Sequence, residues 1–368
     1  MAGTRNDVML NISAHLTHAR RQNNLTGVIR MKKSFFILAL ALACAVQSSA
    51  QEKAPLRLVQ TITVPGARHW DHFGVDLKGN RLFASSEEDP AVEVFDLRTN
   101  KHLQSLTEFT EPHNVMPFPD LKKIFVVDGG ASEIKVLDYD SYKLIGRTEL
   151  TVDADPYVYD PASKYLYVVN GGRAAHTPTC LISIVDTVTG KKLADLKLDT
   201  NRLESMAIEK SGPRLFVNMT GINAIGVVDR KTRAVVETWP VTAGKDNVPL
   251  QYDEATHRLF LATRKPSKLV VVNADSGKEV ASLDVADYVD DLAFDPAHHR
   301  LYIPGGGGNG AVTVVEQRGA DNYQVIATID TKPGAKTARF VPELNKLYVG
   351  VPGKGNQPSQ ILVYDVAP

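Results

Sequence analysis

The chain has 368 residues, with 42 Lys and Arg against 42 Asp and Glu, and 43% of its residues are hydrophobic. This is the composition of a globular protein, and it excludes a disordered chain, a collagen-like chain and a disulfide-dense scaffold. A formal net charge of zero gives no indication of nucleic-acid or membrane binding.

An apolar stretch over residues 35–46 follows Lys32 and Lys33 after one serine, and the small or polar residues of 47–50 come after it. It is shorter than the ~20 apolar residues that a membrane-spanning helix needs. A basic start, a short apolar run and a small-residue end are typical of a secretory signal peptide, which we predict over 31–50. A buried core helix is the alternative. Because Met31 stands where a signal peptide should begin, we interpret residues 1–30 as an upstream extension outside the fold.

Removal of this signal peptide changes the charge and the cysteine content. Residues 1–50 hold six basic residues and one acidic residue, so 36 basic and 41 acidic residues remain, a net charge of −5. This mild acidity makes nucleic acid an unexpected partner. Cys180 would be the only cysteine left, which excludes an intramolecular disulfide and is compatible with a buried thiol. We expect a periplasmic or secreted monomer with no membrane span after cleavage.

An internal repeat recurs seven times at steps of 42 to 49 residues. Each unit carries an aliphatic–aromatic pair and, after it, a β-branched run that ends in a polar residue, usually acidic, as in Ile184-Val185-Asp186. The aromatic positions are Phe83, Phe125, Tyr167, Phe216, Phe260, Tyr302 and Tyr348. Short Val-, Ile- and Tyr-rich runs between regularly spaced turns predict an all-β protein with four strands per unit. That spacing is typical of a propeller blade.

The two ends of the repeat array complement each other. The seventh unit stops at its third strand, residues 361–365, three residues before the C-terminus. Residues 56–64 read like the missing fourth strand. A propeller closes its ring in this way because an unpaired blade edge is costly. We therefore predict one seven-bladed β-propeller over 56–368, with four-stranded blades and with the N-terminal strand completing the last blade.

Segments such as 164–170 and 184–191 (KYLYVVN and IVDTVTGK) resemble the YVTN repeat, and the chain is similar to the YncE-like seven-bladed β-propellers over 56–368. The resemblance implies the fold and says little about activity, because its motifs mark blade packing. Relatives by resemblance include exported proteins of unsettled function, lactonase-like propellers and parts of periplasmic redox enzymes. Fold analogy alone does not choose among them.

In a propeller, the loops that lead into the inner strands and those between the second and third strands share one face, the channel mouth, where ligands usually bind. Imidazole and carboxylate side chains suit Zn, Mn, Fe or Cu. We predict a divalent metal ion held by His72, His113, Asp155 and Glu204, with Asp290 or Asp291 moving protons and Lys336 as their electrostatic partner. Further ligand contacts are expected from His69, Asp71, Asn114, Arg173, His176 and Asn247. The alternative is that these polar residues only line a solvated mouth, where Asp and Asn also suit tight turns.

Three functional hypotheses follow. The first is an exported binding or scaffold protein that presents the mouth to a small molecule, a metal ion or a protein partner. The second is a metal-dependent hydrolase or lyase, for example lactonase-like, with its site at the mouth. The third is a propeller subunit of a periplasmic redox complex. Neither a c-type haem motif nor a nucleophile elbow is present in the sequence.

Overall fold

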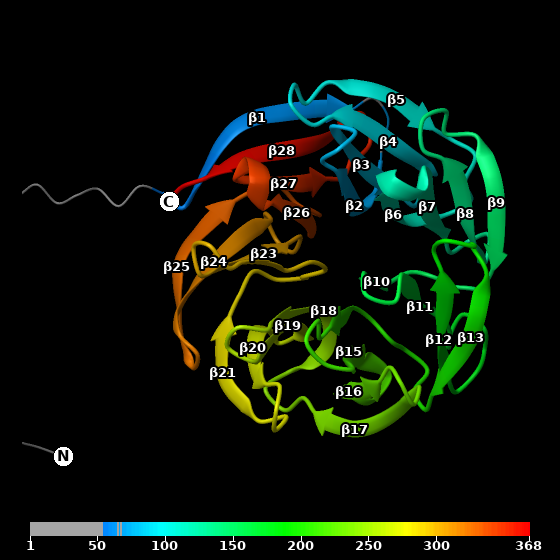
Figure 1. Cartoon of the computed structure of the whole chain (residues 1–368). Coiled ribbons are helices and arrows are strands. Elements are labelled where there is room, and N and C mark those ends of the chain that lie inside the picture. Colours follow the sequence, from blue (N-terminus) through cyan, green and yellow to red (C-terminus); the bar gives the residue numbers. More distant parts are fainter. Residues whose placement is uncertain (1–53, 65, 67) are drawn as a thin grey trace, which may run out of the picture. The chain divides into compact units, whose positions relative to one another are not determined.

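The computed structural model describes residues 54–64, 66 and 68–368, which form seven four-stranded antiparallel sheets arranged in a ring (Figure 1). The all-β class and the seven-bladed propeller predicted from the repeat are confirmed. The predicted signal peptide over 31–50 and the extension over 1–30 lie outside the described residues. Within the described part of the chain, no helix has the length and apolar character needed to cross a membrane.

The first three blades each run outward from an inner strand in chain order. Blade one consists of β2 (Trp70–Asp76), β3 (Arg81–Ser86), β4 (Ala91–Asp96) and β5 (His102–Leu106). Blade two consists of β6 (Pro112–Phe118), β7 (Lys123–Asp128), β8 (Glu133–Asp138) and β9 (Leu144–Glu149), with the 3-10 turn η1 (Pro119–Leu121). Blade three consists of β10 (Tyr157–Asp160), β11 (Tyr165–Gly171), β12 (Cys180–Asp186) and β13 (Lys192–Leu198).

The next three blades repeat this order. Blade four consists of β14 (Met206–Ile208), β15 (Arg214–Met219), β16 (Ala224–Asp229) and β17 (Ala234–Pro240), with η2 (Thr220–Ile222). Blade five consists of β18 (Lys245–Asp253), β19 (Arg258–Lys265), β20 (Ser267–Asn273) and β21 (Glu279–Asp284). Blade six consists of β22 (Ala293–Asp295), β23 (Arg300–Gly305), β24 (Ala311–Gly319) and β25 (Asn322–Asp330).

Blade seven combines the two ends of the described chain: β26 (Thr337–Val341), β27 (Lys346–Val351), β28 (Ser359–Val366) and, outermost, β1 (Leu56–Val64), with η3 (Pro342–Leu344). β1 pairs antiparallel with β28, from Leu56 opposite Val366 to Val64 opposite Ser359. The predicted closure by the N-terminal strand is confirmed. Trp70 of blade one also contacts blade seven, because its indole Nε1 donates to the carbonyl oxygen of Val351, the last residue of β27, at 3.0 Å.

In blades one to five, the polar residue that ends the β-branched run is a turn residue. In blade three, Asp186 Oδ1 accepts hydrogen bonds from the backbone N–H groups of Val188 at 2.7 Å and Thr189 at 3.0 Å. Asn273 makes the same pair of bonds in blade five. Short polar side chains that accept from the backbone two and three residues ahead stabilise such turns. This part of the repeat therefore holds the hairpin between the third and fourth strands.

The repeated aromatic residues form the core between blades. All seven are at most 4% exposed. Phe216 of blade four, for example, packs in one cluster with Leu250 and Leu259 of blade five. Because each aromatic side chain is shared by two sheets, burial of the repeat residues sets the spacing of the blades around the ring.

We expect the contribution of β1 to stability to depend on which face of the strand is altered. Ile62 is 7% exposed and belongs to the core cluster shared by blades one and seven, whereas Leu58 in the same strand is 50% exposed. Ile62→Ala should therefore lower the free energy of unfolding by about 2–4 kcal/mol. Leu58→Ala, the matched control, should change it by less than about 0.5 kcal/mol. Urea denaturation measures both, and equal losses would contradict the proposed role of β1.

Candidate functional site

Three neighbouring blades bring imidazole and carboxylate groups together at the channel mouth. Asp71 and His72 lie near the start of β2, His113 lies near the start of β6, and Asp155 lies two residues before β10. Glu87 follows the end of β3. These five residues are here named the mouth cluster. They converge because the starts of the inner strands and the ends of the second strands share one face of the ring.

The pairing is irregular at the start of β2 and at the start of β6, and this shapes the cluster. The β2–β3 register shifts between Trp70 and Phe73, so Asp71 and His72 lie within a bulge. Successive residues of a regular strand point to opposite faces, and a bulge re-aims a side chain. Both Asp71 and His72 can therefore lie near the same carboxylate of blade three. Next to His113, Gly129 leaves room for the imidazole, because a Cβ there would lie 2.7 Å from the ring.

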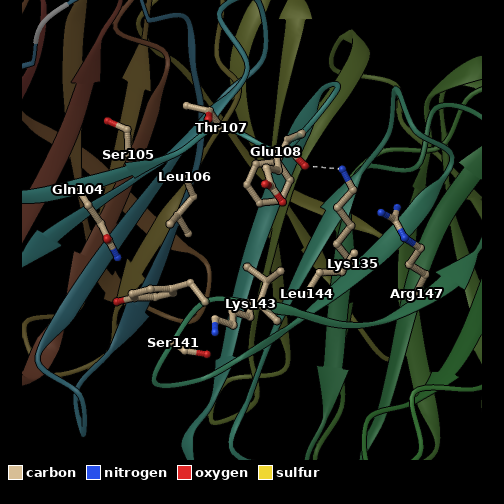
Figure 2. A pocket seen from close by; sticks show the side chains of 13 residues that line it. Gln104, Ser105, Leu106, Thr107, Glu108, Lys135, Ser141, Lys143, Leu144 and Arg147 are labelled. Carbon is tan, nitrogen blue, oxygen red and sulfur yellow. Dashed lines mark hydrogen bonds between the residues drawn. The ribbon is translucent and has the colours of Figure 1, made fainter.

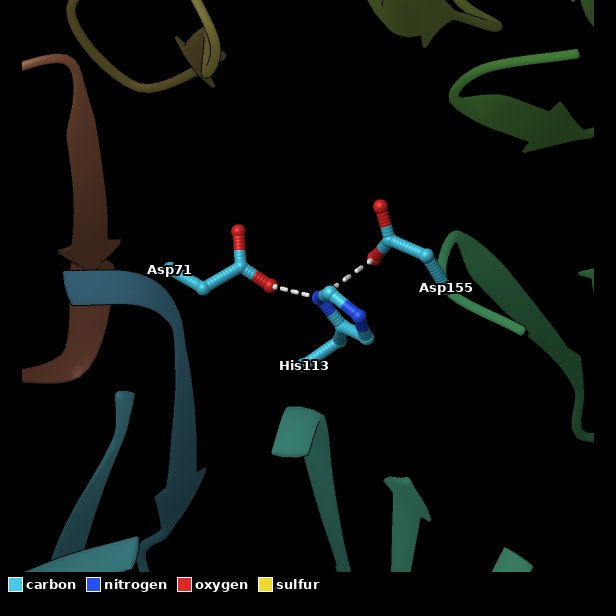
Figure 3. Close-up of side chains that lie close together, drawn as sticks. All are labelled: Asp71, His113 and Asp155. Carbon is cyan, nitrogen blue, oxygen red and sulfur yellow. Dashed lines mark hydrogen bonds and ion pairs between the residues drawn. The ribbon is translucent and has the colours of Figure 1, made fainter. Parts of the chain in front are cut away.

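Figure 3 shows Asp71, His113 and Asp155 pointing toward one another. Nδ1 of His113 lies 2.9 Å from Oδ2 of Asp71 and 3.8 Å from Oδ1 of Asp155. Nε2 of His72 lies 3.6 Å from Oδ1 of Asp71 and 3.9 Å from Oδ1 of Asp155. Asp71 and His113 are buried, at 3% and 7% exposed. Two imidazoles thus face the same two carboxylates at short range.

The charges of the mouth cluster are strongly coupled. Burial disfavours the charged imidazole of His113, but the Asp155 and Asp71 carboxylates outweigh it and raise its pKa to about 10. Burial raises the pKa of Asp155 to about 7, although both imidazoles oppose this shift. Burial alone would raise the pKa of Glu87, but the contact with His69 and the charge of His113 lower it to about 2. A positive charge between the carboxylates, supplied by imidazolium or by a bound cation, is therefore strongly favoured.

Ion pairs form the other side of the mouth. Asp290 contacts both the Lys336 ammonium, at 2.5 Å, and the Arg264 guanidinium. Arg202 pairs with Glu204 at 2.7 Å. Burial raises the pKa of Glu204 to about 7, in spite of Arg202. The two halves of the mouth line one cavity of about 140 Å³, whose residues include Asp71, His72, Glu87, Asp155, Arg202, Glu204, Arg264, Asp290 and Lys336.

The structure places most of the sequence-predicted site residues at this cavity or beside it. Of the predicted metal ligands, His72, His113 and Asp155 come together in the cluster, and Glu204 lines the same cavity but pairs with Arg202. Lys336 holds Asp290. The neighbouring Asp291 lies 3.3 Å from His72 Nδ1 and accepts a hydrogen bond from the Ala338 N–H.

The predicted ligand-contact residues are distributed more widely. Asp71 belongs to the cluster, Asn114 donates to Asp155 Oδ1 at 3.1 Å, and His69 lies 3.6 Å from Glu87. Arg173 lines a neighbouring cavity between blades three and four. His176 is exposed in the same loop and lines none of the cavities described here. Asn247 is fully buried and donates to Asn218 Oδ1 and to the Ala224 carbonyl oxygen. These contacts hold blades four and five together.

Sequence reasoning missed Glu87, Arg202 and Arg264 as site residues. Glu87 and Arg264 come from the second-to-third-strand side of the mouth, whereas the predictions drew mainly on the residues that lead into the inner strands. Charged residues at the ends of the second strands were the available signal. Arg202 lies in the same segment as the predicted Glu204, and its positive charge two residues before Glu204 was a signal for an ion pair.

The mouth cluster has donor atoms suited to a metal ion. One ligand atom each of Asp71, His113 and Asp155 can be chosen so that all three lie within 4.8 Å of one another. Ligands about 2.1 Å from a tetrahedral ion are separated by roughly 3.4 Å. The separations of 2.9 to 3.9 Å among the imidazole nitrogens and carboxylate oxygens of Asp71, His72, His113 and Asp155 bracket that value. His72 lies beside both carboxylates but outside this group of three, so its imidazole would have to move to supply a fourth ligand.

A separate cavity of about 350 Å³ lies away from the mouth, between blades one and two (Figure 2). Leu106, Phe109 and Leu144 contribute to its apolar lining. Lys135 crosses it and donates to the Glu108 carbonyl oxygen at 2.6 Å. It contains none of the predicted site residues, and its cationic Lys135 is already paired with Asp128.

In chelator-treated protein, we expect His113 to remain protonated well above neutral pH. Because its pKa is raised in the folded state, its stabilising effect should be fully present below pH ~6.5 and be lost as the pH rises through about 10. The difference in unfolding free energy between the wild type and His113→Gln should therefore shrink by at least about 1 kcal/mol between pH 6 and pH 10.5. Asp71→Asn should lower the His113 pKa measured by NMR. A stability difference that is constant across this range would contradict the coupling.

No family model matches the sequence, and no curated protein matches it. Among solved structures, a chain of hydrazine synthase from Kuenenia stuttgartiensis is similar, with a TM-score of 0.66 and 16% identity. The match covers 78% of this chain and 94% of that chain. A likeness at this identity shows the fold alone, and the resemblance to YVTN-repeat propellers stays a prediction. What the comparisons establish is a seven-bladed β-propeller with a structural neighbour in hydrazine synthase.

Proposed function

We propose that this protein is an exported β-propeller binding protein whose channel mouth binds a divalent transition-metal ion. The observation that carries the proposal is the convergence of donor atoms of Asp71, His113 and Asp155, with the His72 imidazole beside both carboxylates as the fourth ligand we propose. Mixed imidazole and carboxylate ligands suit Zn, Mn, Fe or Cu better than Ca, which prefers oxygen ligands alone. Two aspartates would balance the charge of one divalent ion.

The neighbours of these four side chains support the same assignment. Asn114 donates to Asp155, and Asp291 lies 3.3 Å from the second ring nitrogen of His72. Metal-binding imidazoles commonly have such a carboxylate partner on the nitrogen that does not bind the ion, which fixes the ring orientation. In this role Asp291 is a positioning residue. Asp290 lines the same cavity and forms ion pairs with Lys336 and Arg264.

Metal binding must compete with protons at this site. The ion needs neutral imidazoles, and the carboxylates raise the pKa of both His72 and His113 in its absence, against the effect of burial. Affinity should therefore rise with pH, and binding near neutral pH should release protons. The hydrolase and redox-subunit hypotheses stay predictions, since no observation on this chain favours either.

Protein purified without chelator or a histidine tag should contain about one Zn, Mn, Fe or Cu ion per chain by elemental analysis. His113→Ala should lower the metal affinity at least about 100-fold in calorimetric titration, because it removes a ligand. His257→Ala is the matched control, since His257 is half-exposed and contacts Asp275 instead. No bound metal in the wild type after reconstitution, or equal affinity in the two variants, would overturn the proposal.

Export is the second part of the proposal, and it rests on the sequence of residues 31–50. Expressed in a bacterium from Met31, the protein should be recovered outside the cytoplasm with Gln51 as its first residue by intact mass and N-terminal sequencing. Replacing Leu38 and Leu40 with Asp should interrupt the apolar run and leave the uncleaved protein in the cytoplasm. Recovery of the unaltered chain, uncleaved and cytoplasmic, would contradict export.

A further inference from the structure

A side pocket opens next to the mouth cluster, between blades three and four. Its volume is about 130 Å³, and it shares Asp155, Pro156, Arg202 and Glu204 with the central cavity. The remaining lining includes Asp153, Arg173 and the buried Cys180. The metal site proposed above uses only Asp155 of these residues. The rest of the pocket is a polar cavity with no role in that site.

One side of the side pocket is rich in carboxylates. Asp153, Asp155 and Glu204 all line it. Arg202 partly neutralises Glu204, but its guanidinium is shared with Asp246 at 2.5 Å. Asp155 accepts a hydrogen bond from the neutral Asn114 amide, which adds no charge. Asp155 also faces the His72 and His113 imidazoles at 3.9 and 3.8 Å, so this side of the pocket offers an ammonium group several hydrogen-bond acceptors rather than a large net negative charge.

Arg173 supplies the opposite charge. Its side chain is exposed and makes no ion pair within the described part of the chain, whereas Arg202, Arg264 and Lys336 are all paired. Its backbone is held firmly, because its N–H donates to the Asn201 carbonyl oxygen at 3.0 Å.

The preceding residue, Gly172, explains why this loop lies against the pocket. It has a φ of +74°, and a Cβ there would approach both the Asn201 carbonyl oxygen and Cys180 Sγ at 2.5 Å. Only glycine accommodates that close approach without strain. The loop therefore positions the base of Arg173 at the pocket and leaves the guanidinium free for a ligand.

We propose that the side pocket binds a small zwitterion, a short amino acid whose ammonium lies among Asp153, Asp155 and Glu204 and whose carboxylate pairs with Arg173. A simple anion would meet the carboxylate side unfavourably, and a simple amine would leave Arg173 without a partner. Arginine binds carboxylates through two parallel hydrogen bonds, which also fixes ligand orientation. The small, mostly polar lining favours a ligand with little or no apolar side chain. This binding does not require the metal ion.

Calorimetric titration of the chelator-treated and metal-loaded protein tests the proposal with glycine, β-alanine and γ-aminobutyrate, which differ in charge separation. At least one zwitterion should bind, and acetate and methylamine, which each carry one of its charges, should bind at least about tenfold more weakly. Arg173→Ala should lower the affinity for the zwitterion at least about tenfold. Because Arg173 is exposed, this variant should fold normally. Arg98→Ala, an exposed arginine in a hairpin of blade one, is the matched control.

The same titrations separate this proposal from the metal site. Arg173→Ala should retain wild-type metal affinity, and His113→Ala should show the lowered metal affinity predicted above but keep its affinity for the zwitterion. If none of the three zwitterions binds in either state of the protein, the proposal is wrong whatever the metal result. Equal zwitterion affinity in Arg173→Ala and Arg98→Ala would also overturn it. Binding of acetate as tight as that of the best zwitterion would replace it with a simple anion site.

Discussion

The antiparallel pairing of β1 with β28 is the constraint on which the remaining structure depends. Without it, β28 would present a row of unpaired backbone groups, and blade seven would lose the strand that covers its outer edge. The closed ring fixes each blade against two neighbours through the repeated buried aromatics. It also directs the starts of all inner strands to one face. The contact of Asp71 in blade one with His113 in blade two, and of both with Asp155 in blade three, follows from that arrangement.

Charge at the channel mouth is the second consequence of closure. Asp71 is nearly fully buried and lies close to Asp155, an arrangement that would be unfavourable for two bare carboxylates. In the metal-free protein, the positive charge of the His72 and His113 imidazolium groups offsets the charge of these carboxylates. A divalent ion would offset the same charge with both imidazoles neutral. Under the proposed function, binding of a cation at the mouth would therefore release protons. In the ligand site proposed for the side pocket, Asp153, Asp155 and Glu204 would accept hydrogen bonds from an ammonium group, and Arg173 would pair with a carboxylate.

The sequence predicted the architecture closely because propeller repeats encode local structure. Residues 56–64 were expected to complete blade seven, and β1 spans Leu56–Val64. The site was harder to predict, since it depends on side-chain direction. Asn247 was expected at the mouth with Asp71, yet its side chain is buried between blades. The pairing shifts near both residues, and alternation along a strand cannot show where such a bulge turns a side chain. The sequence could not link Glu87 to His113, because the two residues are 26 positions apart in the chain and come into contact only in the folded ring.

The central claim, that four side chains from three blades share one metal ion, is tested most directly by anomalous diffraction from crystals of the metal-loaded protein. Data collected on both sides of the absorption edge of the bound element would locate it without reference to the protein chemistry. The account predicts one peak at the channel mouth, within roughly 2.0–2.3 Å of donor atoms of Asp71, His72, His113 and Asp155. No peak there, or a peak only at surface histidines such as His298 and His299, would contradict it.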